Sequence, residues 1–111
     1  MESKAILKFA RLTPRKARRV VDLIRGKKAG AALISLKFMP YGAARPIEKI
    51  LKSAMSNAEH KNTNIDSEEM LISRAFVDQG PIMKRVEQRS MGRANVIKKK
   101  ACHITLILTE K

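Results

Sequence analysis

The chain has 111 residues, with 24 lysines and arginines against 10 acidic residues and a formal net charge of +14. This length favours a single domain, and a hydrophobic content of 44% allows a small core. Such a charge excess repels itself unless a polyanion screens it, so nucleic acid is the first partner class to consider. One cysteine excludes an internal disulfide, and no apolar run reaches the ~18–20 residues of a membrane helix.

The N-terminal part of the chain predicts a short strand followed by a helix. The strand is expected at residues 4–10, with Ala5, Leu7 and Phe9 on one side. The helix is expected between Thr13, a suitable N-cap, and Gly26, which suits the position just past a helix end.

Within this helix, Pro14 fits the first position, and an apolar stripe at helical spacing is expected to face the core. The stripe consists of Ala17, Val20, Val21 and Ile24. The opposite side carries one acid, Asp22, and four arginines: Arg15, Arg18, Arg19 and Arg25.

Two further helices are predicted before the chain changes its pattern. Residues 29–38 form the first, ended by Pro40, with Ala29, Ala32, Leu33 and Leu36 facing inward. The second runs from about residue 43 to residue 60 with Pro46 in its first turn, where a missing N–H is tolerated. Its inward residues are Ile47, Ile50, Leu51, Ala54 and Ala58.

After a polar loop, the apolar period changes from 3.6 to 2. Residues 71–78 predict a strand in which Leu71, Ser73, Ala75 and Val77 alternate with Ile72, Arg74, Phe76 and Asp78. Residues 104–108 predict its partner strand. Residues 79–102, between the two, are basic and too poor in apolar residues to build a core. Such a segment is either disordered or a long hairpin with its tip near Gly92. We favour the hairpin, at about 80–100, attached to a globular part of 1–79 plus 101–111.

The positive charge is unevenly distributed. Residues 1–60 carry a net charge of +10, 61–79 of −2, 80–100 of +6 and 101–111 of zero. The four arginines of the first helix could form an ordinary solvated face, but such faces normally mix both signs. Because a guanidinium binds phosphate through two parallel hydrogen bonds, phosphate binding is the favoured interpretation.

No constellation of catalytic residues is apparent. His60 and His103 lie in different elements without nearby cysteine or carboxylate ligands, and the adjacent Glu68 and Glu69 would not converge on one point. Cys102, before an apolar strand, is expected to be a small buried residue. We therefore expect no enzyme, no cofactor, no metal site and no small-molecule substrate.

Three stretches of the chain have residues in a characteristic order and spacing. They are residues 12–18 with 22–27, then 53–60, and then Lys84, Arg89, Ser90, Gly92 and Arg93 followed by His103, Ile104, Leu106 and Leu108. Over nearly the whole chain they resemble the family of bacterial-type large-subunit ribosomal protein twenty-two.

This resemblance implies an α+β fold, in which three helices pack on a small three-stranded antiparallel sheet and a long β-hairpin protrudes from it. It implies a structural constituent of the large ribosomal subunit that binds and bridges large-subunit rRNA during assembly. Neighbouring large-subunit ribosomal proteins and the nascent peptide are the other expected partners, and no membrane is expected. The expected location is the cytoplasmic ribosome, or an organellar stroma or matrix.

The distribution of charge and the resemblance together predict two sets of functional residues. The rRNA-binding set is Arg11, Arg15, Lys16, Arg18, Arg19, Arg25, Lys27, Lys28, Lys84, Arg85, Arg89, Arg93, Lys98, Lys99 and Lys100. The set expected to line the peptide exit tunnel at the hairpin tip is Ser90, Met91, Gly92, Arg93 and Ala94.

Two other classes of protein share part of this pattern. A freestanding basic RNA- or DNA-binding module, such as an RNA chaperone, has the same charge but little reason to keep a core-poor basic segment between two strands. A cationic membrane-surface protein would need a helix with a large apolar face that carries aromatic residues, and neither arginine-bearing helix has one.

Overall fold

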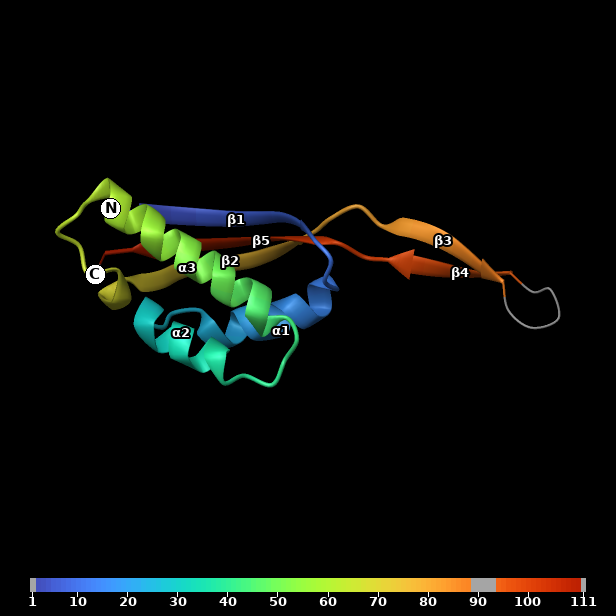
Figure 1. Ribbon diagram of the computed structural model, residues 1–111, viewed down its shortest axis with the longest axis horizontal. Coiled ribbons are helices and arrows are strands. Elements are labelled where there is room, and N and C mark those ends of the chain that lie inside the picture. Colours follow the sequence, from blue (N-terminus) through green and yellow to red (C-terminus); the bar gives the residue numbers. More distant parts are fainter. Residues whose placement is uncertain (1, 89–93, 111) are drawn as a thin grey trace.

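Three helices lie on one side of a three-stranded antiparallel sheet, and a two-stranded ribbon projects from the end of that sheet (Figure 1). The computed structural model describes residues 2–88 and 94–110, and for 83–88 and 94–99 it describes the main chain only. The helices are α1 (Pro14–Ile24), α2 (Ala29–Lys37), α3 (Ala44–Lys61) and the short 3-10 helix η1 (Ser67–Glu69). The strands are β1 (Glu2–Ala10), β2 (Leu71–Gln79), β3 (Met83–Gln88), β4 (Ala94–Lys99) and β5 (Cys102–Thr109). The α+β class and the predicted layers are confirmed.

The last strand in the chain is the central strand of the sheet. The order is β1-β5-β2, so β5 pairs with strands from both ends of the globular part. Ile104, Leu106 and Leu108 of β5 are fully buried under the helices. Both outer strands depend on this strand for their hydrogen-bonded partner, and the predicted pairing of residues 71–78 with 104–108 is confirmed.

The predicted helices are confirmed with small shifts at their ends. The apolar stripe of α1 is fully buried, as are most of the predicted inward residues of α2 and α3, while Leu33 is partly buried. Gly26 has φ of +83°, the left-handed conformation that glycine adopts easily after a helix. Thr13 occupies the N-cap, but its side chain makes no capping hydrogen bond.

The prediction that Phe9 shares a face with Ala5 and Leu7 is wrong. The register between β1 and β5 shifts between Leu7 and Ala10, and Phe9 has φ of +57° within this irregularity. Ala10 therefore turns into the core, while Phe9 is 61% exposed and packs edge-on against the ring of His103 at 4.9 Å. A bulge reverses the alternation of side chains, which a strict period of 2 does not predict.

A second irregularity lies in β2. The pairing with β5 shifts between Ile72 and Arg74, so that Ile72 is buried on the same side as Ala75 and Val77. The simple alternation that assigned Ile72 to the other set is therefore wrong at this position. Phe76, which does follow the alternation, is 40% exposed on the side of the sheet away from the helices.

The hairpin begins where the sheet ends. β3 and β4 are antiparallel, from Met83 opposite Lys99 to Gln88 opposite Ala94. At its base the N–H of Gly80 donates to the carbonyl of Ala101 at 2.9 Å. The molecule measures 64 × 24 × 16 Å, and both termini lie at the end away from the hairpin (Figure 1). The predicted tip at Gly92 lies outside the described residues.

The base of the hairpin gives a prediction about Gly80. A Cβ atom at this position would lie 3.2 Å from the main chain of Ala101, whereas one at Gly42 would meet nothing within 4 Å. We expect Gly80→Ala to lower the free energy of unfolding by about 1 kcal/mol, since the crowded main chain must shift. Gly42→Ala, the control, should change it by less than about 0.5 kcal/mol. Urea denaturation checks this, and equal effects of the two substitutions would contradict it.

Candidate nucleic-acid interface

The exposed side of α1 carries cations with no acidic partner among the described residues. Arg15, Lys16 and Arg19 are exposed, and so is Arg11 just before the helix. The guanidinium carbon of Arg19 lies 5.5 Å from the centre of the Tyr41 ring, a cation–π contact that does not neutralise its charge. These side chains form the first basic surface of the molecule, as the sequence predicted.

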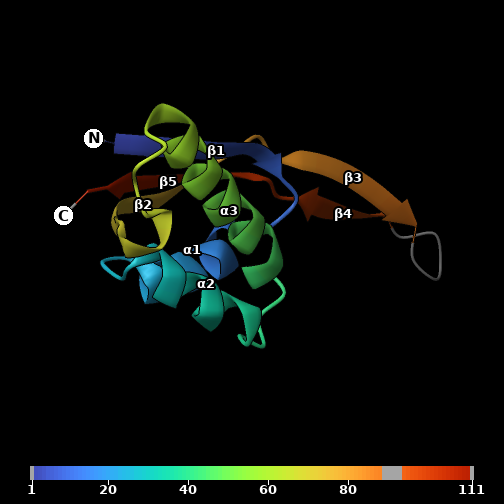
Figure 2. The ribbon, with the colours of Figure 1, turned by 60° about the vertical axis from the view of Figure 1, so that its left-hand side comes forward.

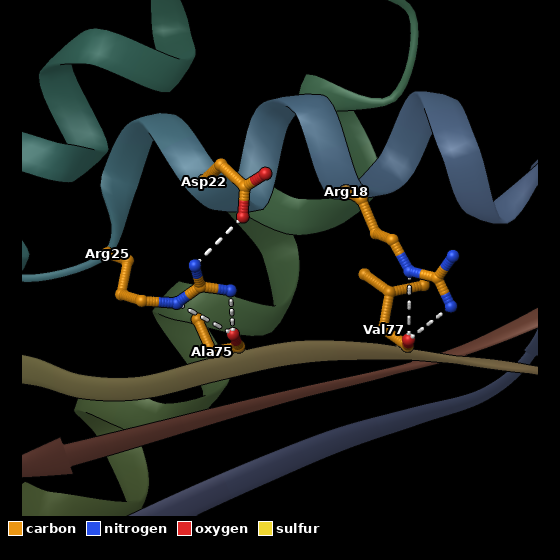
Figure 3. A network of polar contacts seen from close by, with 5 residues as sticks. All are labelled: Arg18, Asp22, Arg25, Ala75 and Val77. Carbon is orange, nitrogen blue, oxygen red and sulfur yellow. Dashed lines mark hydrogen bonds and ion pairs between the residues drawn. The ribbon is translucent and has the colours of Figure 1, made fainter.

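Arg18 of α1 and Arg25, the residue just after the helix, reach toward the edge of the sheet. Arg18 donates from Nε and Nη2 to the carbonyl of Val77, at 3.3 and 3.1 Å. Arg25 donates from Nε and Nη2 to the carbonyl of Ala75, and its Nη1 lies 2.9 Å from Oδ1 of Asp22 (Figure 3). All four arginines are exposed, as expected, but Arg18 and Arg25 are in addition hydrogen-bonded to the edge of the sheet.

The two arginines supply hydrogen-bond donors to carbonyls of β2 that have no strand partner. β2 pairs with β5 on one side only, so the carbonyls of Ala75 and Val77 point outward along the other edge. Farther along the same edge, the N–H of Gly26 donates to Ile72 and the N–H of Ile72 donates to Lys27. α1 and the turn after it thus bind the carbonyls of Ala75 and Val77 and both main-chain groups of Ile72, and they cover a strand edge that would otherwise be open to another chain.

The lysines that follow α1 differ in their surroundings. Nζ of Lys28 lies 2.9 Å from Oε2 of Glu69, and this hydrogen bond and the carboxylate charge raise the pKa of Lys28. Lys27 is exposed and has no acidic partner among the described side chains. Of the two, Lys27 is the one whose charge remains available to a phosphate.

The uncovered face of the sheet carries a second set of cations, which the sequence reasoning missed. Lys4 and Arg74 are both opposite Ile107, so the three form one row across β1, β5 and β2. Exposed Ile6 and Phe76 flank this row. The signal is the period of 2 in residues 4–8, whereas the register shift between Ile72 and Arg74 hides it in β2.

The predicted residues of the hairpin are only partly within the described chain. The register sets Lys84 opposite Lys98, Arg85 opposite Ile97 and Lys99 opposite Met83. Lys100 is exposed between β4 and β5, and Ala94 begins β4. Arg89, Ser90, Met91, Gly92 and Arg93 lie outside the described residues.

The described residues contain no cluster of three or more side chains that could hold a metal ion. In the same part of the chain, no helix is both long and apolar enough to span a membrane. Cys102 is fully buried, as predicted, and this burial raises the pKa of its thiol, while the charge of Arg18 lowers it to a smaller extent.

A helix with unpaired arginines and a basic ribbon that leaves the core define a class of protein, the small basic proteins that bind nucleic acid. The comparisons with known proteins narrow this class. The model of the ribosomal protein L22p/L17e family matches residues 5–109. The chain therefore belongs to this family.

Individual relatives are similar to this chain over most or all of its length. The large ribosomal subunit protein uL22 of Desulforamulus reducens is 54% identical over 111 residues, which cover all of this chain and 97% of the relative. The protein of the same name from Halothermothrix orenii is 50% identical with the same coverage. That of a Synechococcus strain is 50% identical over 105 residues, covering 95% of this chain and 84% of the relative.

The two arginines that bond to the edge of β2 give a prediction about stability. Arg25→Gln should lower the free energy of unfolding by about 1 kcal/mol, because it removes a charged donor from the edge of β2 at a half-exposed site. Arg15→Gln is the matched control on the same helix and should change it by less than about 0.5 kcal/mol. Urea denaturation of both variants checks this, and a loss that is equal in the two would show that Arg25 has no special role at the edge.

Proposed function

We propose that this chain is a structural constituent of the large ribosomal subunit, where it binds and bridges segments of large-subunit rRNA during assembly. The observation that carries the proposal is the unpaired cationic side of α1, on a fold whose family is ribosomal. Arg11, Arg15, Lys16, Arg19 and Lys27 are the residues of the globular part that we assign to phosphate contacts.

The physical basis is the release of counterions. Each lysine or arginine that neutralises a phosphate releases cations condensed on the RNA, and affinity then falls steeply with salt. Arginine adds geometry, because its planar group donates two parallel hydrogen bonds to one phosphate. Arg18 and Arg25 use part of this capacity on the sheet edge, so we assign them a smaller share of the RNA contacts.

The projecting hairpin supports the bridging part of the proposal. The Cα radius of gyration is 17.0 Å, whereas a compact domain of this length has one of about 13 Å. With its longest extent of 64 Å, the molecule reaches RNA segments that such a compact domain does not. Lys84, Arg85, Arg89, Arg93, Lys98, Lys99 and Lys100 are the cations that we assign to this contact. Two basic surfaces on one chain lower the repulsion between the RNA segments they bind.

The tip of the hairpin is the part that we assign to the peptide exit tunnel. Ser90, Met91, Gly92, Arg93 and Ala94 would line its wall and contact the nascent peptide, with neighbouring ribosomal proteins beside them. The proposed location is the ribosome of the cytoplasm, or that of an organelle. The alternative, a freestanding nucleic-acid-binding module, gives no reason for a ribbon that projects this far from the core.

The unpaired side of α1 can be tested with one matched pair of lysines. Lys16 has no acidic partner among the described residues, whereas Nζ of Lys52 lies 3.4 Å from Oε1 of Glu48. We expect Lys16→Gln to weaken binding to large-subunit rRNA and to reduce the slope of log affinity against log salt by about one. Lys52→Gln should leave the slope unchanged. Filter binding at several salt concentrations measures both, and identical slopes would remove α1 from the interface.

The hairpin can be tested in the same assay. Replacing Lys98, Lys99 and Lys100 together with alanine should reduce the slope by about two to three, since up to three phosphate contacts are lost. The far-ultraviolet circular dichroism of the free protein should stay the same, because the three lysines lie outside the core. A slope that does not change would exclude these lysines from the RNA contact.

A further inference from the structure

The two edges of the sheet are covered to different extents. Along β2 the covering continues from Ile72 to Val77, as described above. Along β1 it is supplied by α3, and it starts at the N-terminal end of the strand. Nζ of Lys61 donates to the carbonyl of Glu2 at 2.9 Å, and Nδ2 of Asn57 donates to the carbonyl of Lys4 at 3.1 Å.

This covering stops at Ile6. Because Glu2 and Lys4 point their carbonyls to the free edge, the alternation of an extended strand points both the N–H and the C=O of Ile6 to that edge as well. No described side chain donates to this carbonyl. The middle of β1 is therefore an open strand edge in the described part of the molecule.

An open groove of about 420 Å³ lies along this part of the edge. Its strand side consists of Ala5, Ile6 and Leu7, and its helix side comes from the first half of α3. Pro46 and Ile50 make the helix side apolar, while Arg45 and Lys49 place two positive charges beside it. Both cations are exposed, and neither has an acidic partner within the described residues. Figure 2 shows α3 running diagonally in front of the strands of the sheet.

We propose that this groove binds an extended acidic segment of another protein, which adds to the sheet as a fourth strand beside β1. Strand addition uses the main-chain groups of an open edge for affinity and pockets beside it for alternate side chains. Here the N–H and C=O of Ile6 provide the main-chain pair, and the apolar surface of Pro46 and Ile50 receives one side chain. Arg45 and Lys49 select carboxylates on the segment.

The chemistry of the groove favours a peptide over RNA. A phosphate accepts hydrogen bonds and donates none, so it leaves the outward carbonyl of Ile6 unsatisfied; within RNA only the 2′-hydroxyls and the bases donate. A peptide strand has a donor for that carbonyl and an acceptor for the N–H. The apolar surface likewise suits an aliphatic side chain better than a ribose-phosphate backbone. The inference is independent of the rRNA contacts assigned to α1 and the hairpin.

The experiment uses the full chain and a defined probe, a fluorescent heptapeptide of alternating valine and glutamate with blocked ends. Anisotropy measures its binding, and nuclear magnetic resonance measures the hydrogen exchange of the Ile6 amide with and without the probe. The control peptide has the same sequence with alternate amides N-methylated, which removes donors and keeps charge and side chains. Arg45→Gln/Lys49→Gln is the test variant, and Lys52→Gln is the control on the same helix.

We expect the probe to bind and to slow exchange of the Ile6 amide at least tenfold. N-methylation should abolish the binding, and Arg45→Gln/Lys49→Gln should weaken it about tenfold, with Lys52→Gln unchanged. Three results would overturn the proposal: no binding of the probe, equal binding of the N-methylated peptide, or protection of Ile6 by a single-stranded oligouridylate that displaces the probe. The last result would assign the groove to RNA.

Discussion

The stability of the sheet depends on hydrogen-bond partners for the main-chain groups along its two outer edges. β5 can pair with only one side of β1 and one side of β2, so each outer strand has a row of main-chain groups without a strand partner. Side chains from the helices supply the missing donors: Arg18 and Arg25 for β2, and Asn57 and Lys61 for β1. In a small domain whose core is rich in alanine, these polar contacts tie the helices to the sheet edges as well as to its face.

This requirement divides the cations of the molecule into two groups. One group is held by the protein's own carbonyls or carboxylates, as Arg25 and Lys28 are, and contributes to the stability of the isolated chain. The other, with Arg15 and Lys16 as examples, has no acidic partner in the described structure and is available to a polyanion. A net charge of +14 thus comprises both structural and functional cations, and the second group should contribute most of the salt dependence of RNA binding.

The helices could be predicted from the sequence because an apolar stripe such as Val20, Val21 and Ile24 is buried on one side only if these residues form a helix. Phe9 and Ile72 could not be assigned to a face, because each lies at a register shift that depends on the partner strand. The roles of Arg15 and Arg18 could not be separated either. Both lie on the polar side of α1, and only the position of the β2 edge decides which one donates hydrogen bonds to the sheet.

The central claim is that this chain is a stoichiometric part of the large ribosomal subunit. The most direct measurement follows it through a density gradient of cell extract at high salt, where weak electrostatic association with free nucleic acid is lost. The account predicts one copy per large subunit after this treatment, because many phosphate contacts along α1 and the hairpin act together. Recovery at the top of the gradient, or with free nucleic acid, would contradict it and favour a freestanding binding module.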